Sequence, residues 1–336
     1  MQPPTYAAGV RQRYEDLPVE VHAWVEQRLG EPVVRVRDQV GGFSPGVAAV
    51  VTGRDGGSFF VKAVGSAVNA DAVRFYRRER DAALRLPRVP GILLPVASAE
   101  LEAADQSFPV IVFPALEGAT PRHPWSPGDV TRVLDALADV STQLTPSPWP
   151  DEDGPNRLVE FFRWWQRLAD DDEDPWHDHP WLAGRWGDVV AAEERLRAGL
   201  GGSTLSHTDL RADNVVLTAE RVWFVDWAHA QNAAPWVDAA VLLADVVASG
   251  ADLVDGGGVD VLGLTRTHPA LGGAGPEQLW RLLIGLAGAL HGLSRRPSPP
   301  GLPTIRGWQG GTADTLLRWC VRLDEGSNLG VVARRC

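Results

Sequence analysis

A single lysine stands out in this 336-residue chain, because Lys62 is one of 32 Lys and Arg residues and every other is arginine. A GC-rich genome accounts for the scarcity of lysine but not for the position of the one that remains. Lysine carries a compact ammonium, whereas arginine carries a planar fork, so the two differ at a tight anionic site. Lys62 is therefore the first candidate for contact with a phosphate group.

The residues before Lys62 predict a glycine-rich loop that leads into a hairpin. The loop reads Gly41-Gly42-Phe43-Ser44-Pro45-Gly46 and precedes an apolar run over 47–52. A turn at 55–57 follows, and Lys62 ends the second apolar run, 59–61. A loop of this kind before a lysine-bearing strand suits a polyanion, although Pro45 removes one backbone donor.

A second group of residues supplies oxygen atoms at a suitable spacing. It reads His207-Thr-Asp209-Leu-Arg-Ala-Asp-Asn214, and Asp226 follows twelve residues after Asn214. Phosphoryl transfer needs groups that hold a polyanion, one or two metal ions, and a carboxylate beside the attacking hydroxyl. Asp209 is the candidate base, and Asn214 and Asp226 offer the oxygen ligands that Mg²⁺ prefers. A strand, a turn and a second strand are expected to fold Asp226 back beside Asn214.

The pattern His207-x-Asp209-x4-Asn214, with the downstream Val225-Asp226-Trp227, resembles the catalytic signature of the aminoglycoside phosphotransferase and choline kinase group. These proteins are relatives of the eukaryotic-type protein kinases. The resemblance runs from about residue 41 to residue 244. It implies an α+β, two-lobed protein-kinase-like fold, with an antiparallel sheet in a small N-terminal lobe and a mostly helical C-terminal lobe. It also implies ATP- and Mg²⁺-dependent phosphorylation of a hydroxyl group on a small molecule.

The same resemblance implies a role for each matching residue. Asp209 corresponds to the catalytic aspartate, Asn214 and Asp226 to the metal ligands, and Lys62 to the lysine that contacts the nucleotide phosphates. Glu79 falls where the family places the helix glutamate that pairs with this lysine.

Further nucleotide contacts follow from the resemblance. Ser44 lies in the loop expected to cover the phosphates, and Phe113 to Ala115 match the hinge whose backbone hydrogen-bonds the nucleobase. Two departures are visible: the loop is not Gly-x-Gly-x-x-Gly, and Asp226 is followed by Trp227-Ala228 in place of Phe-Gly. The second departure is typical of small-molecule kinases.

Several residues have a structural interpretation beside the functional one. We expect His207 to hold the loop by packing and a backbone hydrogen bond, and Asp238 to brace the same loop from below. Glu79 has the alternative of a solvated helix position. Arg211 either touches the transferred phosphate or lies exposed.

An acidic run interrupts a tryptophan-rich region of the chain. Its members are Asp170, Asp171, Asp172, Glu173 and Asp174, and the tryptophans are Trp164, Trp165, Trp176, Trp181 and Trp186. The run is either a solvated loop or a cation-binding lip of the acceptor site. Aromatic faces beside carboxylates suit an aminated sugar, although most of these tryptophans have packing as the alternative.

The elements that position these residues follow from periodicity and turn residues. We expect a mixed N-terminal lobe, residues 1–115, with helices over 16–29 and 71–86 and about five strands. A hinge near 113–118 leads to a helical lobe, residues 116–336, with an embedded hairpin of strands at 215–217 and 222–225. Helices are expected there at 127–144, 156–169, 187–199, 236–249, 276–293 and 312–324. Exposed loops are expected at 145–155, 170–181, 255–260 and 294–311.

Composition narrows the classes of partner. The net charge of −11 argues against non-specific binding of nucleic acid and is compatible with a cationic acceptor. Two cysteines make a disulfide framework implausible and favour a reducing cytoplasm. No segment is apolar enough to predict a signal peptide or a membrane span. We expect a monomer or homodimer that acts on a small molecule.

Several functions fit these residues. An aminoglycoside or a related antibiotic is the leading acceptor, and ATP is the expected donor with GTP as an alternative. A metabolite kinase for choline, a sugar or an amino alcohol is the second hypothesis. A nucleotide-binding pseudokinase is the third, although Lys62, Asp209, Asn214 and Asp226 are all intact. A metal-dependent hydrolase leaves Lys62 unexplained.

Overall fold

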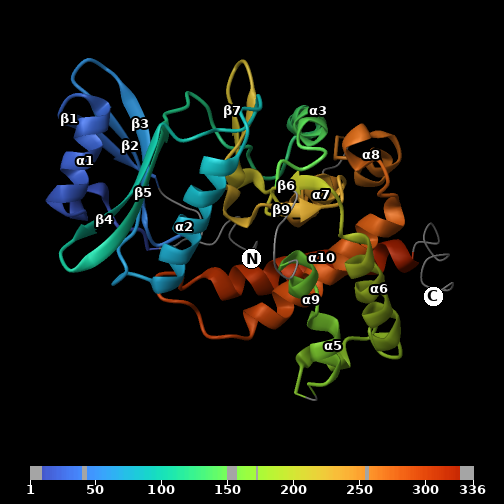
Figure 1. Cartoon of the computed structure of the whole chain (residues 1–336). Coiled ribbons are helices and arrows are strands. Elements are labelled where there is room, and N and C mark those ends of the chain that lie inside the picture. Colours follow the sequence, from blue (N-terminus) through green and yellow to red (C-terminus); the bar gives the residue numbers. More distant parts are fainter. Residues whose placement is uncertain (1–9, 40–43, 150–156, 172, 254–256, 326–336) are drawn as a thin grey trace.

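The computed structural model describes residues 10–39, 44–149, 157–171, 173–253 and 257–325. Figure 1 shows a twisted sheet on one side and a larger group of helices on the other. The expected α+β fold of two lobes is therefore confirmed. The five-stranded sheet ends at Pro114, which supports our proposed boundary at residue 115.

The N-lobe is built on an antiparallel sheet with the strand order β1-β2-β3-β5-β4. The strands are β1 (Val33–Asp38), β2 (Val47–Gly53), β3 (Ser58–Ala63), β4 (Ala97–Ala103) and β5 (Gln106–Pro114). Lys62 lies on the middle strand, opposite Ala48 of β2 and Ile111 of β5. Its backbone is thus held by a neighbouring strand on each side.

Alternation along β3 decides which way Lys62 faces, because successive side chains of a strand point to opposite faces. Val61 and Ala63 belong to the buried cluster that also contains Val21 and Val25 of helix α1 (Val19–Leu29). Phe60 packs in a different cluster, with Ile111 of β5. Lys62 therefore shares the face of Phe60, away from α1.

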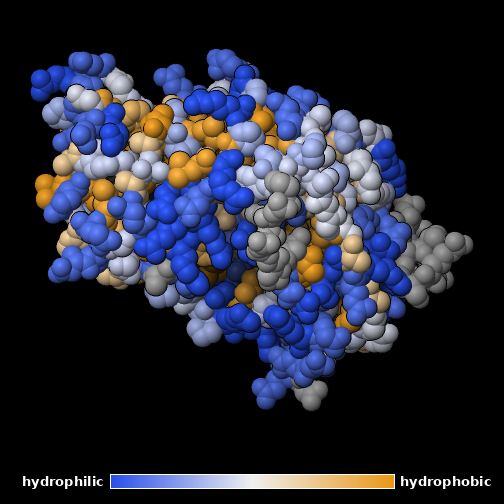
Figure 2. Space-filling view, viewed as in Figure 1, coloured by the Kyte–Doolittle hydropathy of each residue, from blue (hydrophilic) through white to orange (hydrophobic). Residues whose placement is uncertain are grey.

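Helix α2 (Ala70–Arg85) packs beside β5 and the short turn that follows Asp226. It begins at Asn69, whose side-chain oxygen accepts a hydrogen bond of 2.9 Å from the backbone N–H of Ala72. This is a regular N-cap. Arg74 and Arg78 are exposed on the outer face of α2. Figure 2 shows hydrophilic surface where α2 lies in Figure 1, and the inner face of the helix is turned toward the sheet and the C-lobe.

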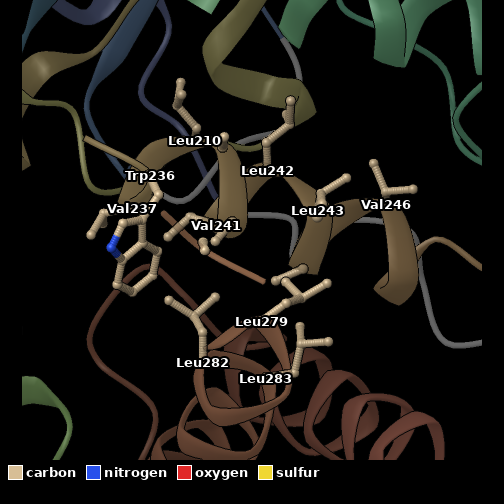
Figure 3. Close-up of a cluster of buried hydrophobic side chains, with 14 of the residues drawn as sticks. Leu210, Trp236, Val237, Val241, Leu242, Leu243, Val246, Leu279, Leu282 and Leu283 are labelled. Atoms are coloured by element: carbon tan, nitrogen blue, oxygen red, sulfur yellow. The ribbon is translucent and has the colours of Figure 1, made fainter. Parts of the chain in front are cut away.

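The C-lobe is mostly helical. Its helices are α3 (Pro127–Gln143), α4 (Arg157–Phe161), α5 (Trp164–Ala169), α6 (Trp186–Gly199), α7 (Val237–Ala248), α8 (Val261–Thr267), α9 (Pro276–Ser294) and α10 (Ile305–Glu325). Helix α7 is buried at every position from Val237 to Val247, as expected for an apolar helix at the centre of a lobe. Figure 3 shows Leu242 and Leu243 of α7 together with Leu279 and Leu283 of α9. Among the described residues, no helix combines the length and hydropathy needed to span a membrane.

Two short antiparallel pairs lie between the helices and hold the segment from 207 to 230. The predicted hairpin is present as β7 (Val215–Leu217) and β8 (Val222–Phe224). A second pair, β6 (Thr204–Ser206) and β9 (Gln231–Ala233), was not predicted. Each of these strands has only three residues, too few to show a period in the sequence.

The helix predicted over 156–169 is wrong, because α4 and α5 are separate helices in the structure. Between them the buried carboxylate of Glu193, on α6, accepts hydrogen bonds from the backbone N–H groups of Trp164 (2.9 Å) and Trp165 (3.2 Å). The side chain of Glu193, distant in the sequence, thus accepts the hydrogen bonds that fix the start of α5. Helix α8 was not predicted, and α10 begins seven residues before its predicted start.

All four loops predicted to be exposed are partly buried among their described residues. The segment 170–181 buries Asp174, Trp176 and Trp181, and the segments 145–155 and 255–260 bury Trp149 and Val259. In the segment 294–311, Leu302 and Gln309 are buried, and α10 has already begun at Ile305. These predictions relied on proline, glycine and aspartate content, which marks turns but not their burial.

The tryptophan-rich region forms packing contacts within the C-lobe. The ring of Trp165 stacks on Trp176 at 5.7 Å, and Trp176 stacks on His291 of α9 at 3.8 Å. Glycines on α9 make room for these rings: a Cβ at Gly288 would lie 2.7 Å from Nε1 of Trp165, and one at Gly292 would overlap the ring of Trp164. The packing interpretation of these tryptophans is the one that the structure supports.

We predict that Gly292→Ala lowers the free energy of unfolding by about 1–3 kcal/mol, because the added methyl group must displace a packed indole ring. Urea denaturation measures this change. Gly187→Ala, on α6 with no atom within 4 Å of the new Cβ, is the matched control and should shift stability by no more than about 0.5 kcal/mol. Equal effects of the two substitutions would contradict the packing argument.

Candidate active site

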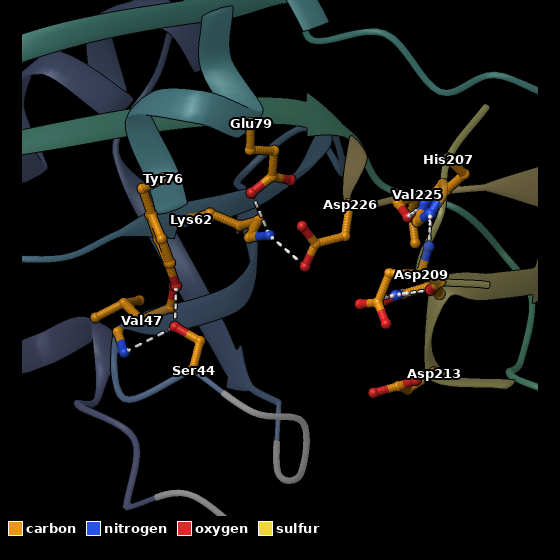
Figure 4. Close-up of polar contacts among 12 residues, drawn as sticks. Ser44, Val47, Lys62, Tyr76, Glu79, His207, Asp209, Asp213, Val225 and Asp226 are labelled. Atoms are coloured by element: carbon orange, nitrogen blue, oxygen red, sulfur yellow. Dashed lines mark hydrogen bonds and ion pairs between the residues drawn. The ribbon is translucent and has the colours of Figure 1, made fainter. Parts of the chain in front are cut away.

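Lys62 is the point where three distant segments of the chain meet (Figure 4). Its Nζ atom contacts Oε2 of Glu79, on α2, and lies 3.2 Å from Oδ2 of Asp226, just after β8. Lys62 is 8% exposed and Glu79 is 3% exposed. The pairing expected for Lys62 and Glu79 is therefore present, and the solvated alternative for Glu79 is wrong.

The charges around Lys62 are unequal, since two carboxylates share one ammonium. Burial alone would lower the pKa of Lys62, but the negative charges of Asp226 and Glu79 outweigh it and raise that pKa. Burial and the charge of Asp226 raise the pKa of Glu79 to about 7. Burial would also raise the pKa of Asp226, but the charge of Lys62 holds it below its usual value. The surplus negative charge favours a cation at this position.

Helix α2 also reaches the segment that leads into β2. The hydroxyl of Tyr76 accepts a hydrogen bond from Ser44 (3.0 Å) and lies 3.3 Å from the carbonyl oxygen of Val47, to which it donates. A Cβ at Gly46 would lie 2.7 Å from the Tyr76 hydroxyl and 2.8 Å from the carbonyl oxygen of Ala63, so this position requires glycine. Ser44 thus anchors the end of the loop to α2. The rest of the predicted loop, 41–43, lies outside the described residues.

The segment around Asp209 is held in place by hydrogen bonds between backbone groups and buried side chains. Asp238, at the start of α7, accepts hydrogen bonds of 2.7 Å from the backbone N–H groups of both His207 and Thr208. Thr208 has a φ of +63°, a conformation that non-glycine residues rarely adopt. Nε2 of the fully buried His207 lies 2.8 Å from the carbonyl oxygen of Val225. The structural roles expected for His207 and Asp238 are confirmed.

Asp209, Asn214 and Asp226 are brought to the same side of the C-lobe. The amide nitrogen of Asn214 donates to the backbone carbonyl of Asp209 at 2.8 Å and to its carboxylate at 3.3 Å, which leaves the amide oxygen for a cation. The side chains of Asp209 and Asp226 stay 37% and 42% exposed. Figure 4 shows both carboxylates directed toward the N-lobe. The predicted fold-back of Asp226 is therefore present.

Arg211 is held between two carboxylates. Its Nε lies 3.4 Å from Asp209 and its Nη2 lies 3.3 Å from Asp213, while the guanidinium lies 5.6 Å from the ring centre of Trp308 on α10. Burial alone would lower the pKa of Arg211, but Asp209 and Asp213 raise it. Burial raises the pKa of Asp213 to about 6, and no described residue donates a hydrogen bond to its buried Oδ1. Arg211 is therefore engaged and not a free surface arginine.

Asp245 supports the same segment from behind and was not identified from the sequence. Its Oδ2 accepts hydrogen bonds from the backbone N–H of Ala212 (3.0 Å) and from Nε1 of Trp125 (2.9 Å), and it lies 3.1 Å from Nε2 of His123. A signal was available, because Asp245 follows Asp238 by two helical turns on an otherwise apolar helix. Two carboxylates on one face of a buried helix require polar partners.

The predicted nucleobase end of the site lies where the two lobes meet. Phe113 is buried at the end of β5, and the backbone N–H of Ala115 lies 3.4 Å from the carbonyl oxygen of Ser58. An apolar cluster surrounds this point. It contains Leu93, Ile111 and Phe113, with Phe60, Leu116, Trp223 and Val225 packed against it. Side chains of both lobes thus share one apolar cluster next to the hinge.

The acidic run contacts α9 and not the segment around Asp209. Asp174 is buried, caps the turn at Trp176 (2.7 Å) and lies 3.0 Å from Nε2 of His291. Asp171 pairs with Arg295 at 3.2 Å. Asp170 and Glu173 are exposed, and Asp172 lies outside the described residues. Asp171 and Asp174 therefore help to hold the loop against α9.

Comparison with known proteins places this site in a family. A model described as the phosphotransferase enzyme family matches residues 36–271, well over half of the chain. The chain belongs to the phosphotransferase enzyme family. Membership was predicted from the residues around Lys62 and Asp209, and the enzyme class, a phosphotransferase, is confirmed with it. A search among curated proteins finds no match.

Solved structures show the same fold at low sequence identity. Choline kinase LicA from Streptococcus pneumoniae has a TM-score of 0.55 at 14% identity, over 90% of this chain and 99% of the other. APH(2")-IIia, solved with GDP and kanamycin, has a TM-score of 0.55 at 12% identity, over 92% and 99%. Amicoumacin kinase hAmiN, solved with AMP-PNP, Ca²⁺ and Ami, has a TM-score of 0.52 at 13% identity, over 88% and 93%.

We predict that Asp238→Asn destabilises this phosphotransferase by about 1–3 kcal/mol and also lowers its turnover. Asparagine keeps one oxygen for the two buried N–H groups of His207 and Thr208, so one donor loses its partner. Urea denaturation and initial rates measure the two effects. Asp139→Asn, an exposed aspartate on α3, is the control, and a wild-type rate in Asp238→Asn would show that Asp238 does not shape the site.

Proposed function

We propose that this phosphotransferase moves the γ-phosphoryl group of ATP to a hydroxyl group of a small molecule, with Mg²⁺ as the metal. The observation that carries the proposal is the buried Lys62, held between Glu79 of the N-lobe and Asp226 of the C-lobe. Asp209 is directed to the same space between the lobes (Figure 4). A cation, metal-binding oxygens and a carboxylate base are the parts that phosphoryl transfer needs.

The nucleotide is proposed to lie with its phosphates at Lys62 and its base in the apolar site beside the hinge. Phe60, Leu116 and Val225 come from both lobes and provide flat apolar surface for a base. Backbone groups of residues 113–115 supply its hydrogen bonds, and Ser44 belongs to the loop over the phosphates. The structures of hAmiN with AMP-PNP and of APH(2")-IIia with GDP support nucleotide use, with ATP preferred here and GTP as an alternative.

Asn214 and Asp226 are proposed to hold Mg²⁺. One carboxylate and one amide oxygen suit this ion, which keeps several waters and takes its remaining ligands from phosphate oxygens. Two carboxylates that share Lys62 leave negative charge at this position, so the donor set fits a divalent cation. When bound, the ion neutralises charge that develops on the phosphates. The Ca²⁺ in the hAmiN structure agrees with a divalent metal.

Asp209 is proposed to act as the base. Its carboxylate orients the acceptor hydroxyl and takes its proton as the hydroxyl oxygen bonds to the γ-phosphorus. The bond from that phosphorus to the β–γ bridging oxygen breaks, and ADP leaves. The backbone bonds from Asp238 hold this segment still. Arg211 is proposed to contact the transferred phosphate, although Asp209 and Asp213 already hold it.

The acceptor is proposed to be an aminoglycoside or a related antibiotic. A net charge of −11 suits a cationic ligand, and APH(2")-IIia was solved with kanamycin. The second candidate is a metabolite such as choline, favoured by the likeness to choline kinase LicA. A cytoplasmic monomer or homodimer without nucleic-acid or membrane partners completes the proposal.

The test is mass spectrometry of aminoglycosides, other hydroxylated antibiotics, amino alcohols and sugars incubated with the protein, ATP and Mg²⁺. We expect one acceptor class to gain a single phosphate. Asp209→Asn should bind Mg-ATP with nearly wild-type affinity by calorimetry while turnover falls by at least about 100-fold, the usual size of a base contribution. Unchanged turnover would remove Asp209 from the base role, and binding without any product would favour the pseudokinase.

The acidic run is proposed to attract a cationic acceptor through its exposed residues Asp170 and Glu173, because Asp171 and Asp174 are engaged and Asp172 lies outside the described residues. We predict that Asp170→Asn combined with Glu173→Gln raises the KM for the acceptor about 2- to 5-fold and leaves the KM for ATP unchanged, as expected for exposed charges. The KM values at two salt concentrations provide the measurement. If both constants stay at wild-type values, Asp170 and Glu173 are solvated charges without a role in acceptor binding. Asp178→Asn is a control for net charge.

A further inference from the structure

The connection between α9 and α10, residues 295–304, reaches across to the N-lobe. The carbonyl oxygen of Pro300 accepts a hydrogen bond of 2.8 Å from the side-chain amide of Asn69. The carbonyl oxygen of Gly301 accepts one of 2.9 Å from the backbone N–H of Val10. A Cβ at Gly301 would lie 2.6 Å from Cβ of Pro45. Figure 1 shows this orange-to-red connection passing beside the base of α2.

Asn69 has two separate functions at the start of α2. Its Oδ1 accepts the N–H of Ala72, which caps the helix, while its Nδ2 donates to Pro300. Asn69 is 9% exposed; its bond to Ala72 is buried, and its bond to the exposed Pro300 is partly buried. A single amide thus begins the helix and joins it to a segment 231 positions away in the sequence.

Helix α2 transmits this contact to the nucleotide end of the site. Tyr76 and Glu79 lie on one face of the helix, one turn apart, and contact Ser44 and Lys62 respectively. Glu79 is ten residues from Asn69, or about 15 Å along the axis. A helix is stiff over that length, so a bond that fixes its first turn also fixes the depth at which Glu79 meets Lys62.

The same connection reaches the catalytic segment at its other end. It continues into α10, where the ring of Trp308 lies 5.6 Å from the guanidinium of Arg211, which pairs with Asp209. Residues 300–308 therefore contact the N-lobe at Val10 and Asn69 and the C-lobe at Arg211, beside Asp209. Helix α2 also packs against β5 and the turn that follows Asp226, and the connection adds a contact at its first turn.

We propose that Asn69 and residues 300–301 form a latch between the lobes, and that Asn69 is a positioning residue for Lys62. The latch sets α2 so that Glu79 directs the ammonium of Lys62, and Gly301 supports Pro45 at the end of the phosphate loop. This inference rests on the proposed role of Lys62 in nucleotide binding. Loss of the latch weakens Mg-nucleotide binding without unfolding the enzyme.

Asn69→Asp separates the two functions of the residue. Aspartate caps a helix as well as asparagine does, so α2 still begins at residue 69. It has no N–H to donate to Pro300 and places a charge against that carbonyl oxygen. Gly301→Ala is the second variant, since its methyl group would collide with Pro45. Gly184→Ala is the matched control: its φ of +74° is close to the +79° of Gly301, but nothing lies within 4 Å of the new Cβ.

We expect Asn69→Asp and Gly301→Ala to weaken Mg-ATP binding about 3- to 10-fold, because the first loses a partly buried hydrogen bond and the second pushes Pro45 away. Calorimetry measures the Kd and steady-state kinetics the KM for ATP. The KM for the acceptor and kcat at saturating ATP should stay within about twofold of wild type. Gly184→Ala should bind Mg-ATP normally.

The outcomes separate this inference from the proposed function. If the wild-type protein does not bind Mg-ATP, the proposed function fails. If wild type binds and the folded Asn69→Asp variant binds equally well, the latch is wrong. The latch is also wrong if Gly184→Ala and Gly301→Ala lose affinity for Mg-ATP in the same proportion to their fall in Tm. The loss of affinity would then come from lower stability in general.

Discussion

The sharing of one buried ammonium by two carboxylates organises the whole molecule. Lys62 is held by the sheet, Glu79 by α2, and Asp226 by the β7–β8 hairpin. A buried charge without a partner is costly, so each of these elements must keep its place for the other two to be stable. The two lobes are therefore joined by the ion pairs of Lys62 with Glu79 and Asp226.

The remaining parts of the fold can be understood as supports for this contact and for Asp209. Alternation along β3 turns Lys62 away from the core under α1 and toward the C-lobe. Helix α7 is buried from Val237 to Val247 and is apolar except for Asp238 and Asp245, whose oxygens accept hydrogen bonds from the backbone of the segment around Asp209. An apolar helix thus carries the two polar groups that hold a strained turn. The packing of α7 makes the support rigid, and Asp238 and Asp245 are the groups through which α7 holds the segment around Asp209.

The sequence was sufficient to predict the fold class, the family and the convergence of Lys62, Glu79, Asp226 and Asn214. These residues lie in short motifs whose spacing is set by a hairpin or a loop, so local patterns carry the information. Asn69, Asp213 and Trp308 were missed. Their partners either lie on other elements of the fold or give no recognisable pattern in the neighbouring sequence. The acidic run looked solvated or functional, yet Asp174 is buried beneath His291. The amino-acid composition of a segment does not show which of its charged side chains is buried by contact with another element.

The unequal charge around Lys62 has a consequence for the order in which ligands arrive. The ammonium of Lys62 lies against the carboxylate of Asp226, the group that is proposed to hold Mg²⁺. A lone metal ion must displace this ammonium, and a lone nucleotide brings further negative charge to a site that already has a surplus. A nucleotide with its metal already bound brings less net negative charge than a free nucleotide. Its phosphates are a partner for Lys62, and its metal is a partner for Asp226. For the proposed reaction, the Lys62–Asp226 ion pair therefore favours joint entry of metal and nucleotide over stepwise entry.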